Sequence, residues 1–226
     1  MYDEGVIKFA ARHETRALEE RTYLSTACEL IAWREILAQT GLVGQDPRLY
    51  GGAGYGNVSA RVPPFGETGR GRRRFLITGT QTGGSACMGL GQFCVVTRYD
   101  VSRNEVDSFG EILPSSESMT HGALYDLAPS VRYVLHAHSP IIWRQAKELK
   151  IPTTPPEVPY GTPQMARAVE TLYQQSTLPE VRILAMGGHE DGIVVFGRTA
   201  DEAGAVMMRH LAAAYGRVCD ANRVLC

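Results

Sequence analysis

The chain has 226 residues, of which 23 are Lys or Arg and 24 are Asp or Glu, so its formal charge is −1. With 44% hydrophobic and 21% charged residues, it has the composition of a globular protein and not of a disordered one. This balance excludes a broad attraction to nucleic acid or an anionic membrane, and no apolar run approaches the roughly 20 residues that span a bilayer. We expect one cytosolic domain over residues 1–226, with residues 1–20 as an N-terminal extension.

Neither the cysteines nor a group of neighbouring arginines predicts a site by itself. The five cysteines are odd in number and include no Cys-x-x-Cys pair, so neither a disulfide framework nor a thiolate metal site is expected. Arg70, Arg72, Arg73 and Arg74 form a local basic cluster in a connection rich in Pro and Gly. We interpret that cluster as a solvated loop.

The first half of the chain predicts one long helix and then several strands. Apolar residues recur at helical spacing over residues 22–39, and Gly41 follows where a helix commonly ends. Residues 49–55 are too rich in glycine for regular structure and lead into an alternating strand over residues 57–62. Residues 75–78 and 93–97 are predicted to be further strands.

The second half alternates helices with strands. Ser115 or Ser116 is predicted to cap a helix that runs to Leu127, and residues 131–138 form a strand. Thr162 and the following proline begin another helix, and residues 181–186 form another strand. A capping box at residues 199–202 begins the last helix.

Three histidines provide the main chemical signal. His136 and His138 are separated by one residue in a predicted strand, so both imidazoles point to the same face and could share one divalent metal. His189 follows a strand and two glycines that allow the backbone to approach closely, and it is the third candidate ligand. A fourth coordination position would then be open to substrate, as in catalytic zinc sites.

A carboxylate stands at the start of the helix that is predicted to run to Leu127. Glu117 lies in the first turn behind two serines, where capping and the helix dipole favour these residue types for stability alone. His121, four residues on, lies on the same side of the helix and could orient the carboxylate or pair with it. Both a structural and a catalytic interpretation of Glu117 remain open at this point.

Two loops rich in glycine and threonine could surround an anion with backbone N–H groups and hydroxyls. Gly56 and Asn57 come before one strand, and residues 78–84 come after another.

The order of these motifs resembles the class II aldolase and adducin family over about residues 30–215. The resemblance rests on Gly-Asn-Val-Ser at 56–59, Ile-Thr at 77–78, Pro-Ser-Ser-Glu at 114–117, His-Ala-His at 136–138 and the late His189. It implies a single-domain α/β fold with a central, mainly antiparallel sheet covered by helices in three layers. It also implies a homotetramer with sites at subunit interfaces.

The resemblance further implies a metal-dependent carbon–carbon lyase that cleaves a ketose phosphate or a related hydroxy-keto compound through a metal-stabilised enediolate. His136, His138 and His189 would hold the metal, with Zn²⁺ favoured and Mn²⁺ or Co²⁺ as alternatives. Glu117 would be the acid/base group. The residues implied around the substrate phosphate are Gly56, Asn57, Thr82, Gly83, Ser115 and Ser116.

Some features depart from the aldolase pattern. Gly54 and Tyr55 stand where the aldolases place a hydroxyl residue, and Thr78-Gly79 competes with the favoured Thr82-Gly83 as the phosphate loop. Glu157 and His121 are candidates for a second acid/base group. Epimerisation, decarboxylation or dehydration at the same metal site is therefore the alternative, and a non-catalytic scaffold is disfavoured because it needs no histidine cluster. The tyrosines that could enter the site are Tyr2, Tyr55, Tyr160 and Tyr215.

Overall fold

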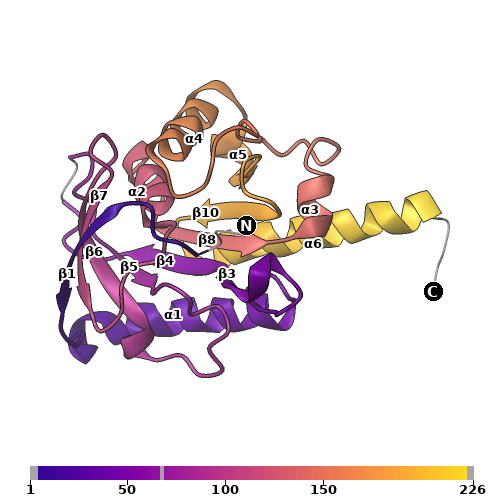
Figure 1. Cartoon of the computed structure of the whole chain (residues 1–226). Helices are drawn as coiled ribbons and strands as arrows, with labels where there is room; N and C mark the ends of the chain where they lie inside the picture. The colour runs from indigo at the N-terminus through magenta and orange to yellow at the C-terminus, as the bar shows by residue number, and fades with distance from the viewer. Residues whose placement is uncertain (1–4, 67–68, 223–226) are drawn as a thin grey trace.

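An eight-stranded sheet forms the centre of the computed structural model, which describes residues 5–66 and 69–222 (Figure 1). The strand order is β1-β7-β6-β5-β4-β8-β10-β9, and every neighbouring pair is antiparallel except β1 and β7. The strands are β1 (Ala10–Thr15), β4 (Asn57–Arg61), β5 (Phe75–Thr78), β6 (Phe93–Asp100), β7 (Glu105–Gly110), β8 (Tyr133–His138), β9 (Ile183–Ala185) and β10 (Gly192–Gly197). A separate two-residue pair joins β2 (Gly44–Gln45) to β3 (Gly54–Tyr55).

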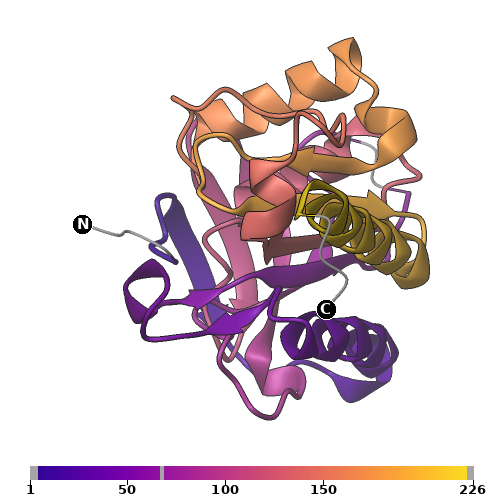
Figure 2. The same cartoon turned by 90° about the vertical axis from the view of Figure 1, so that its right-hand side faces the viewer.

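Helices cover both faces of this sheet, which gives three layers. One face carries α1 (Glu20–Gln39), α3 (Pro140–Arg144) and α6 (Ala200–Asn222). The other carries α2 (Ser118–Leu127), α4 (Pro163–Gln175) and α5 (Leu178–Val181). Figure 2 shows α1 and α6 on the same side of the sheet, with α4 on the opposite side. Short 3₁₀ turns occur at Tyr50–Gly52 and Leu90–Gln92. The predicted α/β class with a mainly antiparallel sheet is confirmed.

Period-two alternation along the strands divides the core into two halves. In β8, Leu135 and Ala137 pack into the α1 and α6 half, whereas Val134 packs into the α2 and α4 half. His136 and His138 have the same parity as Val134, so they point to the α2 side. The alternation therefore places both imidazoles under one layer of helices.

The structure confirms most of the predicted elements and adds several. The helices at residues 22–39 and after Thr162 are present, and the Thr162 hydroxyl accepts a hydrogen bond from the Met165 N–H. Strands β7 and β10 and helix α5 were not predicted, and the 49–55 segment contains a 3₁₀ turn and strand β3. Strand β1, within the predicted N-terminal extension, was missed because its side chains are largely exposed and only pairing with β7 makes it a strand.

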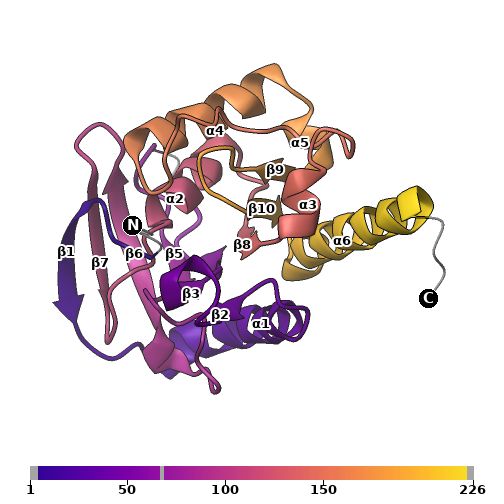
Figure 3. The same ribbon diagram turned by 45° about the vertical axis from the view of Figure 1, so that its right-hand side comes forward.

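Helix α6 continues past the edge of the sheet (Figure 3). Tyr215, in α6, is 56% exposed, so it does not enter a site within its own chain. Among the described residues, no helix combines the length and apolarity that crossing a bilayer requires.

Candidate metal and acid/base site

Three buried histidines converge at the end of β8. His136 and His138 extend from that strand, and His189 comes from the turn between β9 and β10. One ring nitrogen of each lies within 4.8 Å of the others. The ring centroids are 5.1 Å apart for His136 with His138 and with His189, and 4.7 Å apart for His138 with His189. The sequence-predicted cluster is therefore brought together.

The backbone before His189 makes this convergence sterically feasible. A Cβ at Gly188 would lie 1.9 Å from the Val158 carbonyl oxygen, so the neighbouring loop leaves no room for a side chain there. Glycine at this position lets the 155–159 loop pack directly against the chain next to His189.

Two of the three histidines, His136 and His138, are held in the neutral form that metal ligands need. The Nδ1 of His136 lies 3.2 Å from the Ile193 carbonyl oxygen and must donate to it, which leaves an unprotonated Nε2 in the neutral ring. Within residues 5–66 and 69–222, that buried Nε2 has no hydrogen-bond partner. Burial, reinforced by His189, lowers the pKa of both His136 and His138 well below the usual value. Neutral imidazoles with a second-sphere carbonyl bond suit a divalent metal.

Glu117 brings a buried carboxylate to this cluster. Its Oε1 lies 3.8 Å from Nδ1 of His189, and the residue is 2% exposed. The helix begins later than predicted, because Glu117 itself is the N-cap of α2 and neither Ser115 nor Ser116 caps it. The Ser115 hydroxyl instead accepts a hydrogen bond from the Glu117 N–H at 3.3 Å. This turn holds the carboxylate at the helix terminus nearest the histidines.

Part of the predicted anion-binding set lies next to the cluster. Asn57 is directly opposite His136 in the pairing of β4 with β8. Its side-chain Oδ1 is buried and has no partner among the described residues. Gly56 immediately precedes it, and a Cβ there would lie 3.1 Å from the His136 carbonyl oxygen. Ser116 is also buried, one residue before Glu117.

Polar groups of the loop that contains Thr82 and Gly83 form hydrogen bonds with other groups of the protein. The Thr82 hydroxyl donates to the Gly79 carbonyl oxygen at 2.8 Å. The guanidinium of Arg34, from α1, donates to the Gly83 carbonyl at 2.6 Å. The loop is fixed by these contacts, and the only proton of the Thr82 hydroxyl is already used.

The two further acid/base candidates lie in different environments. His121 bonds toward β4: its Nδ1 lies 2.6 Å from the Ser59 hydroxyl, which also bonds to the Tyr125 hydroxyl at 2.6 Å. Complete burial lowers the pKa of His121 to about 3. Glu157 is exposed, on the loop that packs against Gly188.

Aromatic rings enclose the cluster, and sequence reasoning anticipated only some of them. Tyr160 stacks on His189 at 4.4 Å, and the Lys8 ammonium lies 3.7 Å from the Tyr160 ring centroid. Tyr50, which was not predicted, packs edge-on against His138 at 4.5 Å and donates its hydroxyl proton to Asp191. Its φ of 48° is unusual for an aromatic residue, and such backbone is concentrated near functional sites.

Tyr55 lies 5.5 Å from His138, whereas Tyr2 falls outside the described residues. Lys8 belongs to the segment predicted as an extension, so part of that segment contacts the aromatic surroundings of the site. The sequence did not indicate this contact, because residues 1–20 contain no recognisable motif.

The fold and site together define a class II aldolase and adducin domain. The family model for the class II aldolase and adducin N-terminal domain matches residues 37–215, and the chain belongs to this family. No curated protein matches the sequence significantly.

Several solved structures share the fold at low sequence identity. YgbL from Klebsiella pneumoniae, named only provisionally as an aldolase, epimerase or decarboxylase, is 19% identical with a TM-score of 0.63, over 90% of this chain and 93% of that one. L-fuculose-1-phosphate aldolase from Thermus thermophilus is 19% identical with a TM-score of 0.59, over 86% and 95%. A sugar-phosphate aldolase from Thermotoga maritima is 17% identical with a TM-score of 0.61, over 90% and 99%.

Proposed function

We propose that this protein is a metal-dependent carbon–carbon lyase that cleaves a ketose phosphate or a related hydroxy-keto compound. The observation that carries the proposal is the buried Glu117 carboxylate, 3.8 Å from a histidine that belongs to a three-histidine cluster. A carboxylate that only capped a helix would have no need for burial beside three imidazoles. Membership in the class II aldolase and adducin family supports the same reaction class.

His136, His138 and His189 would hold a divalent metal, with Zn²⁺ favoured and Mn²⁺ or Co²⁺ as alternatives. The donor set fits, because three imidazoles leave a coordination position open to substrate at a catalytic zinc. When bound, the metal supplies a Lewis acid that stabilises negative charge developing on a substrate oxygen.

Glu117 would hold the proton that the reaction moves to carbon. Cleavage of the bond between C3 and C4 transfers the C4 hydroxyl proton to a second acid/base group, for which Glu157 and His121 are the candidates, and leaves the electron pair of the broken bond on the other fragment. A protonated Glu117 would deliver its proton to that carbon, and as carboxylate it would take a proton in the reverse direction. Its nearly complete burial excludes bulk water from this exchange.

Asn57 and Ser116 would orient the polar end of the substrate, since both are buried near the histidines. Gly56, Ser115, Thr82 and Gly83 are the remaining members of the proposed phosphate set. A homotetramer with sites at subunit interfaces, and a cytosolic location, belong to the same proposal.

A second candidate function keeps the metal site and changes the reaction to decarboxylation, epimerisation or dehydration. Within this alternative, which includes sugar-phosphate 4-epimerisation, decarboxylation is favoured by the Thr82 hydroxyl, whose proton is donated to the Gly79 carbonyl and not offered to a phosphate. A substrate with a carboxylate in place of the phosphate would demand fewer hydroxyl donors from that loop.

A ketose-phosphate panel tests the lyase proposal. We expect release of dihydroxyacetone phosphate from at least one member, and loss of that activity in Glu117→Gln with the metal still bound. Glu180→Gln, an exposed carboxylate on α5, is the matched control and should be fully active. Carbon dioxide release from a carboxylic acid, without aldol cleavage of any ketose phosphate, would instead select the second function.

Metal analysis tests the shared premise. The purified protein should contain one divalent ion per chain, and His136→Ala should lose it. A chain with no stoichiometric metal, whose melting temperature does not rise on addition of Zn²⁺ or Mn²⁺, would contradict both functions.

A further inference from the structure

A cavity lies at the opposite end of α2 from the histidine cluster. It has a volume of about 460 Å³ and is bordered by the loop at residues 70–72, the end of β6, and helices α2 and α4. None of the candidate metal or acid/base residues lines it. Since α2 has ten residues and rises 1.5 Å per residue, its two ends are about 15 Å apart. Cavities of roughly 300–1,000 Å³ are typical of small-molecule sites.

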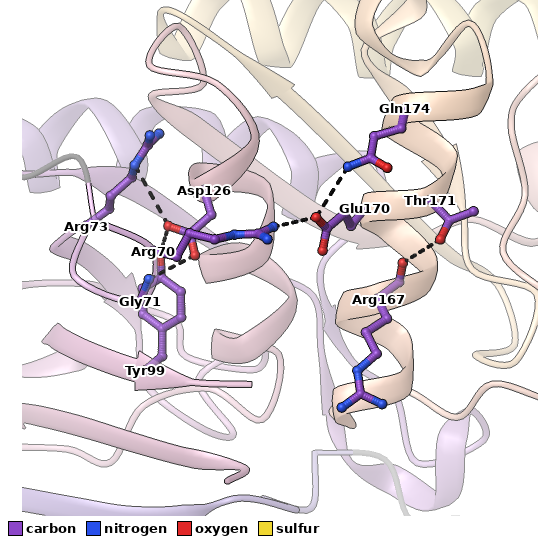
Figure 4. Close-up of polar contacts among 9 residues, drawn as sticks. All are labelled: Arg70, Gly71, Arg73, Tyr99, Asp126, Arg167, Glu170, Thr171 and Gln174. Carbon is purple, nitrogen blue, oxygen red and sulfur yellow. Dashed lines mark hydrogen bonds and ion pairs between the residues drawn. The ribbon is translucent and has the colours of Figure 1, made fainter. Parts of the chain in front are cut away.

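Four arginines from three separate segments line this cavity: Arg70, Arg72, Arg98 and Arg167. Three carboxylates also line it, but each has partners of its own. Glu170 accepts from Arg70 at 2.6 Å and from the Gln174 amide at 3.3 Å (Figure 4). Asp100 accepts from the Ser102 N–H and hydroxyl and from the Arg103 N–H within its own turn.

Asp126, the third carboxylate, holds the wall of the cavity together. It accepts a hydrogen bond from the Tyr99 hydroxyl at 2.8 Å and from the Gly71 N–H at 2.9 Å, and Arg73 approaches it at 3.8 Å (Figure 4). The Gly71 carbonyl in turn accepts from the Tyr99 N–H at 2.9 Å. A Cβ at Gly71 would lie 2.2 Å from the Tyr99 carbonyl oxygen, so only glycine allows this approach.

These contacts fix the loop between its two arginines. Gly71 is bonded on both sides, so Arg70 and Arg72 extend from a backbone that is already in place before any ligand arrives. Preorganisation of this kind reduces the ordering cost of binding.

Three guanidinium groups remain available for a ligand. Within the described parts of the chain, no carboxylate lies within ion-pair distance of Arg72, Arg98 or Arg167. Figure 4 shows the Arg167 guanidinium extending away from Glu170. The planar fork of a guanidinium matches phosphate oxygens in pairs.

We propose that this cavity is a second ligand site, which binds a small phosphorylated molecule. Arg72, Arg98 and Arg167 would contact the phosphate, while Ala123 and Ala166 provide an apolar wall for the rest of the ligand. The limited volume of the cavity favours a small molecule over a nucleic acid, which would need an extended basic surface. The site is independent of the lyase proposal, because it shares no residue with it.

Isothermal titration of the full-length protein with phenyl phosphate, at physiological ionic strength, tests the assignment. We expect binding by the wild type and a roughly tenfold or greater loss of affinity in the double variant Arg98→Gln/Arg167→Gln, because charge-assisted hydrogen bonds are removed. Arg103→Gln, an exposed arginine outside the cavity, should bind as the wild type does.

Phenyl phosphate can also enter the proposed catalytic phosphate set, so Ser116→Ala separates the two sites: any binding event that this variant loses belongs to the catalytic site, and the event that depends on Arg98 and Arg167 should persist in it. No loss of any binding event in the double variant, disappearance of the Arg98- and Arg167-dependent event in Ser116→Ala, or no binding by the wild type would each overturn the proposal. Binding of a single-stranded oligonucleotide through these arginines without binding of phenyl phosphate would also overturn it. Arg98, Arg167 and Arg103 are exposed, so we expect their substitution to leave folding intact. Urea denaturation midpoints equal to that of the wild type check this.

Discussion

A chain of buried hydroxyl and imidazole groups beneath α2 allows a quantitative test of the packing. The Ser59 hydroxyl bonds to Nδ1 of His121 and to the Tyr125 hydroxyl, both at 2.6 Å, and all three residues are 0% exposed. Ser59→Ala removes the shared oxygen, so both bonds are lost at once. Tyr125→Phe removes the Tyr125 hydroxyl and leaves the bond between Ser59 and His121 in place.

Ser59→Ala should therefore lower the free energy of unfolding by at least twice as much as Tyr125→Phe does. A buried hydrogen bond contributes about 1 kcal/mol net, and a buried polar group left without its partner costs about 1–3 kcal/mol. We expect Tyr125→Phe to lower the free energy of unfolding by about 1 kcal/mol. Ser59→Ala leaves two groups without this partner and should lower it by about 2–6 kcal/mol.

Urea denaturation of the metal-free protein measures both effects. With a slope of about 3 kcal/mol/M, Ser59→Ala should lower the midpoint by about 0.7–2 M. Ser130→Ala, at an exposed position, is the control and should leave it unchanged. Equal shifts for Ser59→Ala and Tyr125→Phe would refute the reasoning, because they would show that the shared oxygen carries no second bond.

Three other predictions concern packing, capping and pH. Gly204→Ala should lower the free energy of unfolding by about 1–3 kcal/mol, because the added Cβ would lie 2.1 Å from the Trp33 ring. The Cβ added by Gly216→Ala would meet nothing within 4 Å, so this variant should stabilise α6 by up to about 1 kcal/mol. Equal melting temperatures for the two variants would contradict this prediction. Thr162→Ala removes the cap of α4 and should cost about 1 kcal/mol by urea denaturation, while an unchanged midpoint would show that the cap contributes nothing. Burial lowers the pKa of His121 from 6.5 to about 3, so below pH 6.5 the unfolded chain binds a proton that the folded chain refuses, and stability falls as pH decreases toward 3. In the metal-free protein, His121→Asn should make that decline shallower, and an unaltered pH dependence would show that His121 does not contribute to it.

Local patterns in the sequence were enough to predict much of the fold. The helical spacing over residues 22–39 corresponds to α1, and the alternation over residues 131–138 corresponds to β8. These elements follow from periodicity, which is a property of neighbouring residues. The pair His136 and His138 was predicted to share a face for the same reason, and the structure confirms that it does.

Contacts between segments far apart in the chain determine features that local sequence patterns did not predict. Strand β1 has exposed, polar side chains and is a strand because β7 supplies its backbone partners. His121 forms its hydrogen bond with Ser59, 62 residues away in the chain, although helix periodicity predicted that His121 would lie beside Glu117.

The sequence alone determined which side chains could perform metal and acid/base chemistry, because residue type fixes ligand atoms and proton affinities. Only the tertiary structure decided which of them meet: it brought His189 to β8 and Glu117 to His189, surrounded them with Tyr50 and Tyr160, and left Glu157 exposed. The physical reason is that distances between residues far apart in the chain depend on the packing of the whole sheet, which no local pattern encodes.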